Sequence, residues 1–251
     1  MSGHSKWASI KHKKAVVDSR RGKLFTKLAR AVTVAAKEGG GDIEGNAALA
    51  LAVQKARDAS MPKDNIERAI AKGTGAGADA DALETILYEG YGPGGVALLI
   101  EAVTDNRNRT GAAVRHMLSK HNGSLGEPGS VAYNFDKKGT IVVEADRYSE
   151  DDLMVAIDAG AEDISLDDDV YEIVTEPSDL TAVRNALEAA DIEIQNAEVT
   201  QRPKVRVALD EETAAKLLRL IDVLEDNDDV DAVHANFEVD ADVLERLMAA
   251  S

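Results

Sequence analysis

Two segments, DLMVAIDAGAEDI at residues 152–164 and DLTAVRNALEAADI at residues 179–192, decide how the chain folds. Each opens with Asp-Leu, continues through the apolar spacing of a short helix, and closes on Asp-Ile, where a strand is expected to begin. Together with the strand candidates on either side, the two segments give the order β-α-β-β-α-β over residues 140–201. This order of elements is the ferredoxin-like pattern.

The elements around this unit predict an α+β fold. If the unit is complete, the strands before and after it must pair with each other, so residues 79–136 and 203–251 form one discontinuous α/β domain. The ferredoxin-like α/β domain of residues 137–202 is inserted into it, and a basic helical domain of residues 1–78 precedes both. We therefore predict an N-terminal three-helix domain followed by two α/β domains, at least one of them ferredoxin-like, the second inserted into the first.

Hydrophobic periodicity places the individual elements. In the helical domain, apolar residues recur on one face of residues 22–38, and the glycines at 39–41 end that helix. Asn46 is a suitable N-cap for a second helix, Pro62 fits the first turn of a third, and a glycine-rich linker follows at 73–78. The expected strands are 85–91, 96–104, 130–135, 140–145, 163–166, 171–175, 192–199, 205–209 and 231–239, and the later helices 107–121, 150–159, 179–190, 211–225 and 241–249.

The composition excludes several classes of protein. The 251 residues are 44% apolar but only 4% aromatic, so the cores are expected to consist of small aliphatic side chains. With no cysteine, the chain has no disulfide, no thiolate nucleophile and no cysteine metal ligand. No secretory signal is visible after the basic start, and the longest strongly apolar run, residues 96–100, is too short to span a bilayer. We therefore expect a cytoplasmic protein with no membrane partner.

Charge is divided unequally along the chain. The formal net charge is −17, yet residues 1–75 hold 15 Lys and Arg against 7 Asp and Glu, whereas the remaining 176 residues hold 14 against 39. Residues 1–37 contain 10 basic residues and one acid, Asp18. An acidic body repels a phosphate backbone at long range, but a basic patch can still bind one within a Debye length of about 8 Å. The division predicts a contact with a polyanion that is confined to the N-terminal segment.

The N-terminal segment, MSGHSKWASIKHKKAVVDSRRGKLFTKLAR at residues 1–30, is the most informative functional feature. On a helical wheel, five cations fall within an arc of about 100°, so one face can pack on the bundle while another contacts phosphates: Arg20, Lys23, Lys27, Arg30 and Lys37. Trp7, among the lysines ahead of this helix, could stack on an exposed base. The predicted nucleic-acid-binding residues are His4, Lys6, Trp7, Lys11, His12, Lys13, Lys14, Arg20, Arg21, Lys23, Lys27 and Arg30.

Two other interpretations of this segment stay open. A run of charge is commonly a solvated helix face, although ten bases against one acid make that interpretation weaker here. A basic amphipathic helix can also lie on an anionic membrane, but no bulky apolar face opposes these cations. Contact with nucleic acid is therefore preferred.

A glycine-rich segment at residues 88–95, YEGYGPGG, carries a secondary candidate. Its glycines match the spacing of a dinucleotide-binding loop, but that loop requires a helix after it, and residues 96–100 read as a strand. A hairpin turn is the better interpretation. Tyr91 at its tip is a candidate for a secondary contact with the ligand.

A strand-to-helix junction at residues 104–111, TDNRNRTG, carries two more candidates. Asp105 or Asn106 can cap the helix, which explains most of the segment. The amides of the first turn, together with Arg107 and Arg109, could also hold a phosphate. These two arginines are kept as a secondary contact.

No group of residues points to catalysis or to a metal. The carboxylates are too numerous for any two to be singled out as an acid and a base, and His116 and His121 are too isolated for a metal site. The acidic run at 226–229 lacks the glycine of a calcium loop, and Phe237 stands where the bidentate Glu is required. We predict no enzyme activity, no cofactor and no metal.

The chain contains several long motifs: GHSKW at 3–7, IKHKKA at 10–15, RGK at 21–23, MPKDNIERAI at 61–70, YEGYGPGG at 88–95, and TDN and NRT within 104–110. These motifs resemble the YebC/PmpR family, whose mitochondrial relatives include the translational activator of cytochrome c oxidase subunit I. The resemblance covers essentially the whole chain and implies three domains and a non-enzymatic role in gene expression. It also implies that the basic arm from His4 to Arg30 contacts nucleic acid.

These observations predict a non-enzymatic, nucleic-acid-binding regulator of gene expression. The resemblance implies either a DNA-binding transcriptional regulator, which is the usual family description, or a ribosome-associated translation factor that contacts rRNA or tRNA and eases stalls. The acidic body favours RNA slightly, because a folded RNA pocket can admit the arm alone, and the ribosome is then a partner. The alternative from another class is an acidic adaptor that binds a basic protein.

Overall fold

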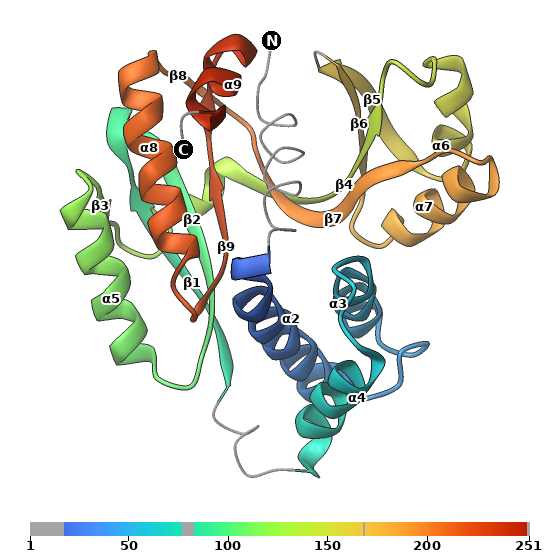
Figure 1. Ribbon diagram of the computed structural model, residues 1–251, viewed down its shortest axis with the longest axis horizontal. Helices are drawn as coiled ribbons and strands as arrows, with labels where there is room; N and C mark the ends of the chain where they lie inside the picture. The colour runs from blue at the N-terminus through green and yellow to red at the C-terminus, as the bar shows by residue number, and fades with distance from the viewer. Residues whose placement is uncertain (1–17, 77–82, 168, 250–251) are drawn as a thin grey trace.

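The structure is a computed structural model, and it describes residues 18–76, 83–167 and 169–249. It contains a bundle of N-terminal helices and two four-stranded sheets, each covered by helices (Figure 1). The predicted α+β fold, with helices first and two α/β parts after them, is confirmed.

The N-terminal helices form a three-helix bundle. The bundle consists of α2 (Asp18–Gly39), α3 (Ala47–Asp58) and α4 (Lys63–Ala71), which continues into a tight turn (Lys72–Ala76). Asn46 caps α3 by accepting a hydrogen bond from the amide of Leu49. At Gly73 the chain passes so close to α2 that an added Cβ would lie 2.3 Å from the carbonyl oxygen of Thr33, so only glycine fits. The bundle core contains Leu28, Val32, Ala35, Leu49, Val53, Ala56, Met61, Ile66 and Ala69.

The first sheet joins strands that lie far apart in the sequence. Its order is β3-β1-β2-β9, with β1 (Glu84–Tyr91), β2 (Ala97–Thr104), β3 (Ser124–Leu125) and β9 (Val230–Ala235), and every pairing is antiparallel. In β2 and β9, Leu98 pairs with Ala235 and Ile100 with Val233. The strands before and after the ferredoxin-like unit therefore do pair with each other.

Both faces of β2 are covered, which explains its continuous apolar run. Leu98 and Ile100 pack against α5 (Arg107–Lys120) and α8 (Glu211–Glu225), which lie together on one side of the sheet in Figure 1. On the opposite face, Val103 packs with Val34 of α2 and with Leu83. The central strand thus joins the helical bundle to the first sheet.

The second sheet is built from consecutive residues. Its order is β5-β6-β4-β7, all antiparallel, and α6 (Met154–Asp158) and α7 (Leu180–Ala189) pack on one face. The predicted β-α-β-β-α-β unit is therefore present, with the strand order of a ferredoxin-like sheet. The strands are β4 (Phe135–Glu144), β5 (Ala161–Asp167), β6 (Val170–Thr175) and β7 (Ile194–Pro203).

Several predicted elements were wrong in detail. The strand expected at 130–135 is absent except for Phe135, because a short 3-10 turn (Ala132–Asn134) takes its place, and the strand expected at 140–145 is the second half of β4. The reason is Glu89, whose carboxylate accepts hydrogen bonds from the amides of Gly129, Val131 and Ala132 at 2.5, 2.7 and 2.8 Å and so withdraws them from a strand ladder. The helix expected at 150–159 is a 3-10 turn (Asp151–Leu153) followed by the short α6.

The C-terminal strands are also shorter than predicted. Instead of strands at 205–209 and 231–239, the chain has β8 (Val207–Ala208) and β10 (Phe237–Glu238), which pair parallel, in addition to β9. Asn236 interrupts the second stretch, because its side chain accepts a hydrogen bond from the amide of Ala97 and donates one to the carbonyl of Val205. The last helix is α9 (Ala241–Ala249).

The glycine-rich segment at 88–95 is a hairpin turn, as predicted. β1 and β2 pair antiparallel on either side of it, and residues 93–95 form a short 3-10 turn between them. Gly94 and Gly95 both have φ of +75°, a conformation that favours glycine. The interpretation as a dinucleotide-binding loop is thereby excluded.

The exact boundaries predicted for the three domains stay a prediction.

Candidate nucleic-acid interface

Three of the predicted nucleic-acid-binding residues lie on one side of α2. Lys23, Lys27 and Arg30 occupy successive turns of the helix, and at 100° per residue they fall within about 60° of one another. Leu28 and Val32 lie on the other side and are buried in the bundle core. The separation of a packing face from a cationic face, predicted from the helical wheel, is present in these residues.

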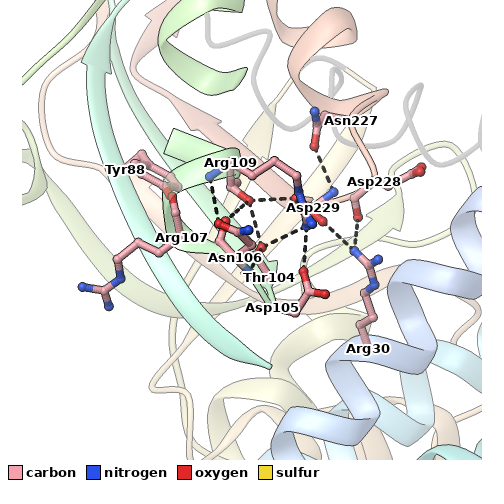
Figure 2. Close-up of polar contacts among 11 residues, drawn as sticks. Arg30, Tyr88, Thr104, Asp105, Asn106, Arg107, Arg109, Asn227, Asp228 and Asp229 are labelled. Atoms are coloured by element: carbon pink, nitrogen blue, oxygen red, sulfur yellow. Dashed lines mark hydrogen bonds and ion pairs between the residues drawn. The ribbon is translucent and has the colours of Figure 1, made fainter. Parts of the chain in front are cut away.

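The cationic side of α2 contacts the end of α8 and the loop after it, residues 225–229, which we call the acidic loop. Lys23 Nζ lies 2.8 Å from Asp226 Oδ1, and Lys27 Nζ donates to the carbonyl oxygen of Glu225. Arg30 Nη1 donates to the carbonyl oxygen of Asp228 at 2.9 Å and to Asp229 Oδ1 at 3.0 Å (Figure 2). All three cations that were predicted to bind phosphate are therefore bound to oxygen atoms of the protein itself.

Asp229 is the centre of this contact. Its Oδ1 accepts from Arg30, while its Oδ2 accepts from Arg109 Nη2 at 2.8 Å and from the hydroxyl of Thr110 at 2.7 Å (Figure 2). Asn227 Oδ1 accepts from the Asp229 amide at 2.9 Å, which fixes the loop backbone. One carboxylate thus joins α2, the first turn of α5 and the acidic loop.

The pKa of Asp229 reflects these partners. Burial of the carboxyl raises its pKa, but the hydrogen bonds from Arg109, Thr110 and Arg30 outweigh that effect, so the pKa is lowered overall. The pKa of Arg109 is raised, first by its hydrogen bond to Asp229 and then by the one to Asp105. Both groups are charged at neutral pH, and the contact is an ion-pair network.

The end of α8 attracts cations for two reasons. The last carbonyl groups of a helix carry a partial negative charge, and α8 has no basic residue in its last turn to offset it. Four carboxylates follow within five residues: Glu225, Asp226, Asp228 and Asp229. Carbonyl and carboxylate oxygens together present to α2 the same kind of acceptor that a phosphate backbone would.

The two arginines at the start of α5 have separate partners. Asn106 caps the helix, since its Oδ1 accepts from the Arg109 amide at 3.1 Å, which settles the choice between Asp105 and Asn106. Arg109 bridges Asp105 at 2.7 Å and Asp229 at 2.8 Å. Arg107 lies 2.9 Å from Glu84, and its side chain is 66% exposed. Their assignment as a secondary phosphate contact stays a prediction.

The hydroxyl groups of two tyrosines are used within the fold. Tyr91 donates to the carbonyl oxygen of Ser130 at 3.1 Å, and its side chain stays partly exposed. Tyr88 donates to the carbonyl oxygen of Arg107 at 3.2 Å. Tyr91 is therefore anchored next to the turn that Glu89 holds, with its ring still open to a partner.

The other predicted residues cannot be placed beside these. His4, Lys6, Trp7, Lys11, His12, Lys13 and Lys14 lie outside the described residues. Arg20 and Arg21 belong to the first turns of α2, and their side chains are not described. The arm that precedes α2 is thus a prediction from sequence alone.

The bundle has a second contact, with the ferredoxin-like unit. Lys55 of α3 lies 3.4 Å from Glu198 of β7, and Arg184 of α7 lies 3.2 Å from Asp58 of α3. Leu51 of α3 packs, partly buried, against the core of that unit. Figure 1 shows α3 next to α7 and β7.

The contact between the acidic loop and α2 was not predicted from the sequence. The loop's run Asp226-Asn227-Asp228-Asp229 is opposite in charge to the cationic side of α2, and this complementarity is the sequence signal that could have found the contact. Within the described part of the chain, no three His, Asp or Glu side chains gather as a metal site would require. No helix in the described ranges has the length and hydropathy needed to cross a membrane.

Comparison with known proteins places the chain in a family. Residues 5–76 match the TACO1/YebC protein N-terminal domain, and residues 83–237 match the TACO1/YebC second and third domain. A crystal structure of a conserved hypothetical protein, Aq1575 from Aquifex aeolicus, is 46% identical and superposes with a TM-score of 0.79 over 89% of this chain and 92% of that chain.

Relatives from two bacteria carry the same name, probable transcriptional regulatory protein. The protein from Rubrobacter xylanophilus is 56% identical over 245 residues, which cover 97% of this chain and 98% of that protein. The protein from Acidothermus cellulolyticus is also 56% identical over 245 residues, covering 97% of this chain and 99% of that protein. With both domain matches and these relatives spanning nearly its whole length, the chain belongs to the TACO1/YebC family.

Proposed function

We propose that this protein is a cytoplasmic, non-enzymatic regulator of gene expression that binds nucleic acid through its N-terminal basic segment, with RNA favoured over DNA. The observation that carries the proposal is the cationic side of α2, where Lys23 and Lys27 align on the helix that follows the basic arm in the sequence. The relatives named probable transcriptional regulatory protein support a role in regulation.

The preference for RNA rests on shape and charge. The 176 residues after the N-terminal region have 39 acidic against 14 basic residues, so a long open duplex beside them would be repelled. A folded RNA, such as a pocket in the ribosome, can accept the arm while the acidic body stays outside. Of the common DNA-reading modules, no helix-turn-helix or zinc module is evident in the sequence.

The test is charge reversal within the arm. Lys11, Lys13, Lys14 and Arg20 are changed to Glu, and binding to a fluorescein-labelled RNA hairpin and to a DNA duplex of equal length is measured by anisotropy at physiological salt. The matched control reverses four exposed cations elsewhere: Arg57, Lys72, Arg115 and Lys120. We expect the arm variant to lose binding and the control to keep most of it. Equal binding by the two variants would contradict the proposal.

Comparing the two probes tests the choice of ligand. Tighter binding of the hairpin supports the RNA proposal, and tighter binding of the duplex reverses it. The acidic adaptor is the rival, because the carboxylates of the α/β parts already bind cations of α2. A protein partner captured after nuclease treatment, equally by the wild-type chain and the arm variant, would favour that rival.

A further inference from the structure

We propose that the acidic loop is a built-in competitor for the ligand: Asp226 and the carbonyl end of α8 occupy Lys23 and Lys27 until nucleic acid displaces them. This inference rests on the proposed function, since it concerns the regulation of the same cationic face. The contact between α2 and the loop then has two parts. The outer part, at Lys23 and Lys27, opens when the ligand binds, and the inner part, the Arg30–Asp229 pair, stays closed.

The exposure of the ion pairs falls along α2. In the outer pair, the side chain of Lys23 is 50% exposed and that of Asp226 is 67% exposed. In the inner pair, the corresponding fractions are 29% for Arg30 and 10% for Asp229. Solvent and a polyanion therefore reach the contact from the Lys23 end.

The outer oxygens imitate a phosphate. Lys23 Nζ approaches both the carboxylate of Asp226 and, at 3.5 Å, its backbone carbonyl, and the Nζ of the neighbouring Lys27 donates to the carbonyl of Glu225. Each of these oxygens takes up a donor of the lysine ammonium and offsets its charge, so the lysine binds a phosphate oxygen more strongly once the loop oxygens have left. Loop and ligand thus compete for the same two cations.

The inner part is built to persist. Asp229 is also bound by Arg109 and Thr110 of α5, so releasing Arg30 would leave a nearly buried carboxylate with fewer donors. An exposed ion pair, in contrast, stabilises by at most about 1 kcal/mol and is weakened by salt. Nucleic acid can therefore displace the outer pair at little cost while the Arg30–Asp229 pair still holds α2 to the first sheet.

The experiment compares two substitutions that remove the same charge from the same loop. Asp226→Asn removes the partner of Lys23. Asp228→Asn is the control, because the Asp228 carboxylate points away from α2 and has no recorded partner among the described residues, while its carbonyl, which Arg30 uses, is retained (Figure 2). Affinity for the fluorescein-labelled RNA hairpin and for the DNA duplex is measured by anisotropy for both variants and the wild-type chain.

We expect Asp226→Asn to bind the preferred probe roughly two- to fivefold more tightly than Asp228→Asn does, the range of one exposed ion pair. Asp226→Asn should also be less stable than Asp228→Asn, by no more than about 1 kcal/mol in the free energy of unfolding, because it alone lacks the pair with Lys23. Equal affinities for Asp226→Asn and Asp228→Asn would overturn the inference, since the gain would then be a general effect of charge. Weaker binding by Asp226→Asn would also overturn it.

A second measurement detects the displacement itself. Carbodiimide coupling of glycine ethyl ester, read by mass spectrometry, reports how accessible each carboxylate is. Adding the probe at saturation should raise labelling of Asp226, because its carboxylate is released from Lys23, and should leave Asp228 unchanged. If Asp226 labelling does not rise although the probe is bound, nucleic acid binds without opening the contact and the inference is wrong.

These outcomes are distinct from a failure of the proposed function. If the arm variant loses binding while Asp226→Asn and Asp228→Asn bind equally, the protein binds nucleic acid through the arm and the loop is a fixed support. If the arm variant binds as well as the wild-type chain, the proposed function itself is wrong, and the competition falls with it.

Discussion

The helical bundle is attached to the two sheets in different ways. Toward the first sheet, Val34 packs with buried apolar side chains, and Arg30 binds the nearly buried carboxylate of Asp229. Toward the ferredoxin-like unit, Leu51 packs only partly buried, and two ion pairs between described residues are Lys55–Glu198 and Arg184–Asp58, in each of which one side chain is more than 45% exposed. Buried networks are costly to disturb, whereas exposed pairs contribute about 0–1 kcal/mol. The bundle and the first sheet should therefore behave as one unit, with the ferredoxin-like unit joined to them more weakly.

The largest effect is expected at the first contact, for Asp229→Ala. The substitution leaves Arg30, Arg109 and Thr110 without a shared acceptor and should lower the free energy of unfolding by about 2–4 kcal/mol. Urea denaturation followed by circular dichroism measures the loss. Asp228→Ala, in the same loop, is the control and should stay within about 0.5 kcal/mol of the wild-type chain. Similar losses for the two variants would show that the network does not hold the bundle to the sheet.

A smaller loss of stability is expected from a substitution in the apolar part of the same contact, at Val34. Val34 is 6% exposed and packs with Leu83 and Val103, so Val34→Ala should cost about 2 kcal/mol through lost burial and the cavity left behind. The same measurement on Val205→Ala, at a position that is 64% exposed, should give a change close to zero. A loss for Val34→Ala no larger than the control would mean that α2 and β2 are not in firm contact.

The pH dependence of stability sharpens the comparison. Because the pKa of Asp229 is lowered in the folded state, its stabilising contribution is complete above the ordinary pKa of an aspartate, about 3.9, and is lost as the pH falls below it toward the folded value. We expect Asp229→Asn to lack this part of the acid sensitivity, so the stability difference from the wild-type chain should shrink below about pH 4. Urea midpoints of both proteins from pH 3 to pH 7 provide the test. A difference that stays constant across this range would argue against an ionised, network-bound Asp229.

Much of the fold could be predicted because its elements are local. The repeat at 152–164 and 179–192 was enough to find the ferredoxin-like unit, and completing it required the outer strands to pair with each other. What failed was set by contacts over long distances. The amides at 129–132 are taken by Glu89, about forty residues earlier, and Asn236 interrupts a strand by binding Ala97 on another. Periodicity contains no information about such partners.

The candidate site was predicted to a smaller extent. The cationic face of α2 could be derived from helical spacing, because Lys23, Lys27 and Arg30 follow the turns of one helix. Their partners could not, since Asp226 and Asp229 lie about 200 residues later in the sequence. Charge complementarity between a basic helix and an acidic run indicates that a contact is favourable. The run reaches α2 only because β9, which follows it, pairs with β2 in the first sheet.

The smallest effect is expected at the second contact, for Asp58→Asn. Arg184 keeps Glu188 at 2.8 Å as a partner, and the new amide oxygen can still accept from Gln54, so the loss should be below about 1 kcal/mol. A double-mutant cycle with Arg184→Gln isolates the pair, and its coupling energy should not exceed about 0.5 kcal/mol. A coupling larger than the loss for Val34→Ala would reverse the comparison. The ferredoxin-like unit, and not the first sheet, would then be the part to which the bundle is firmly joined.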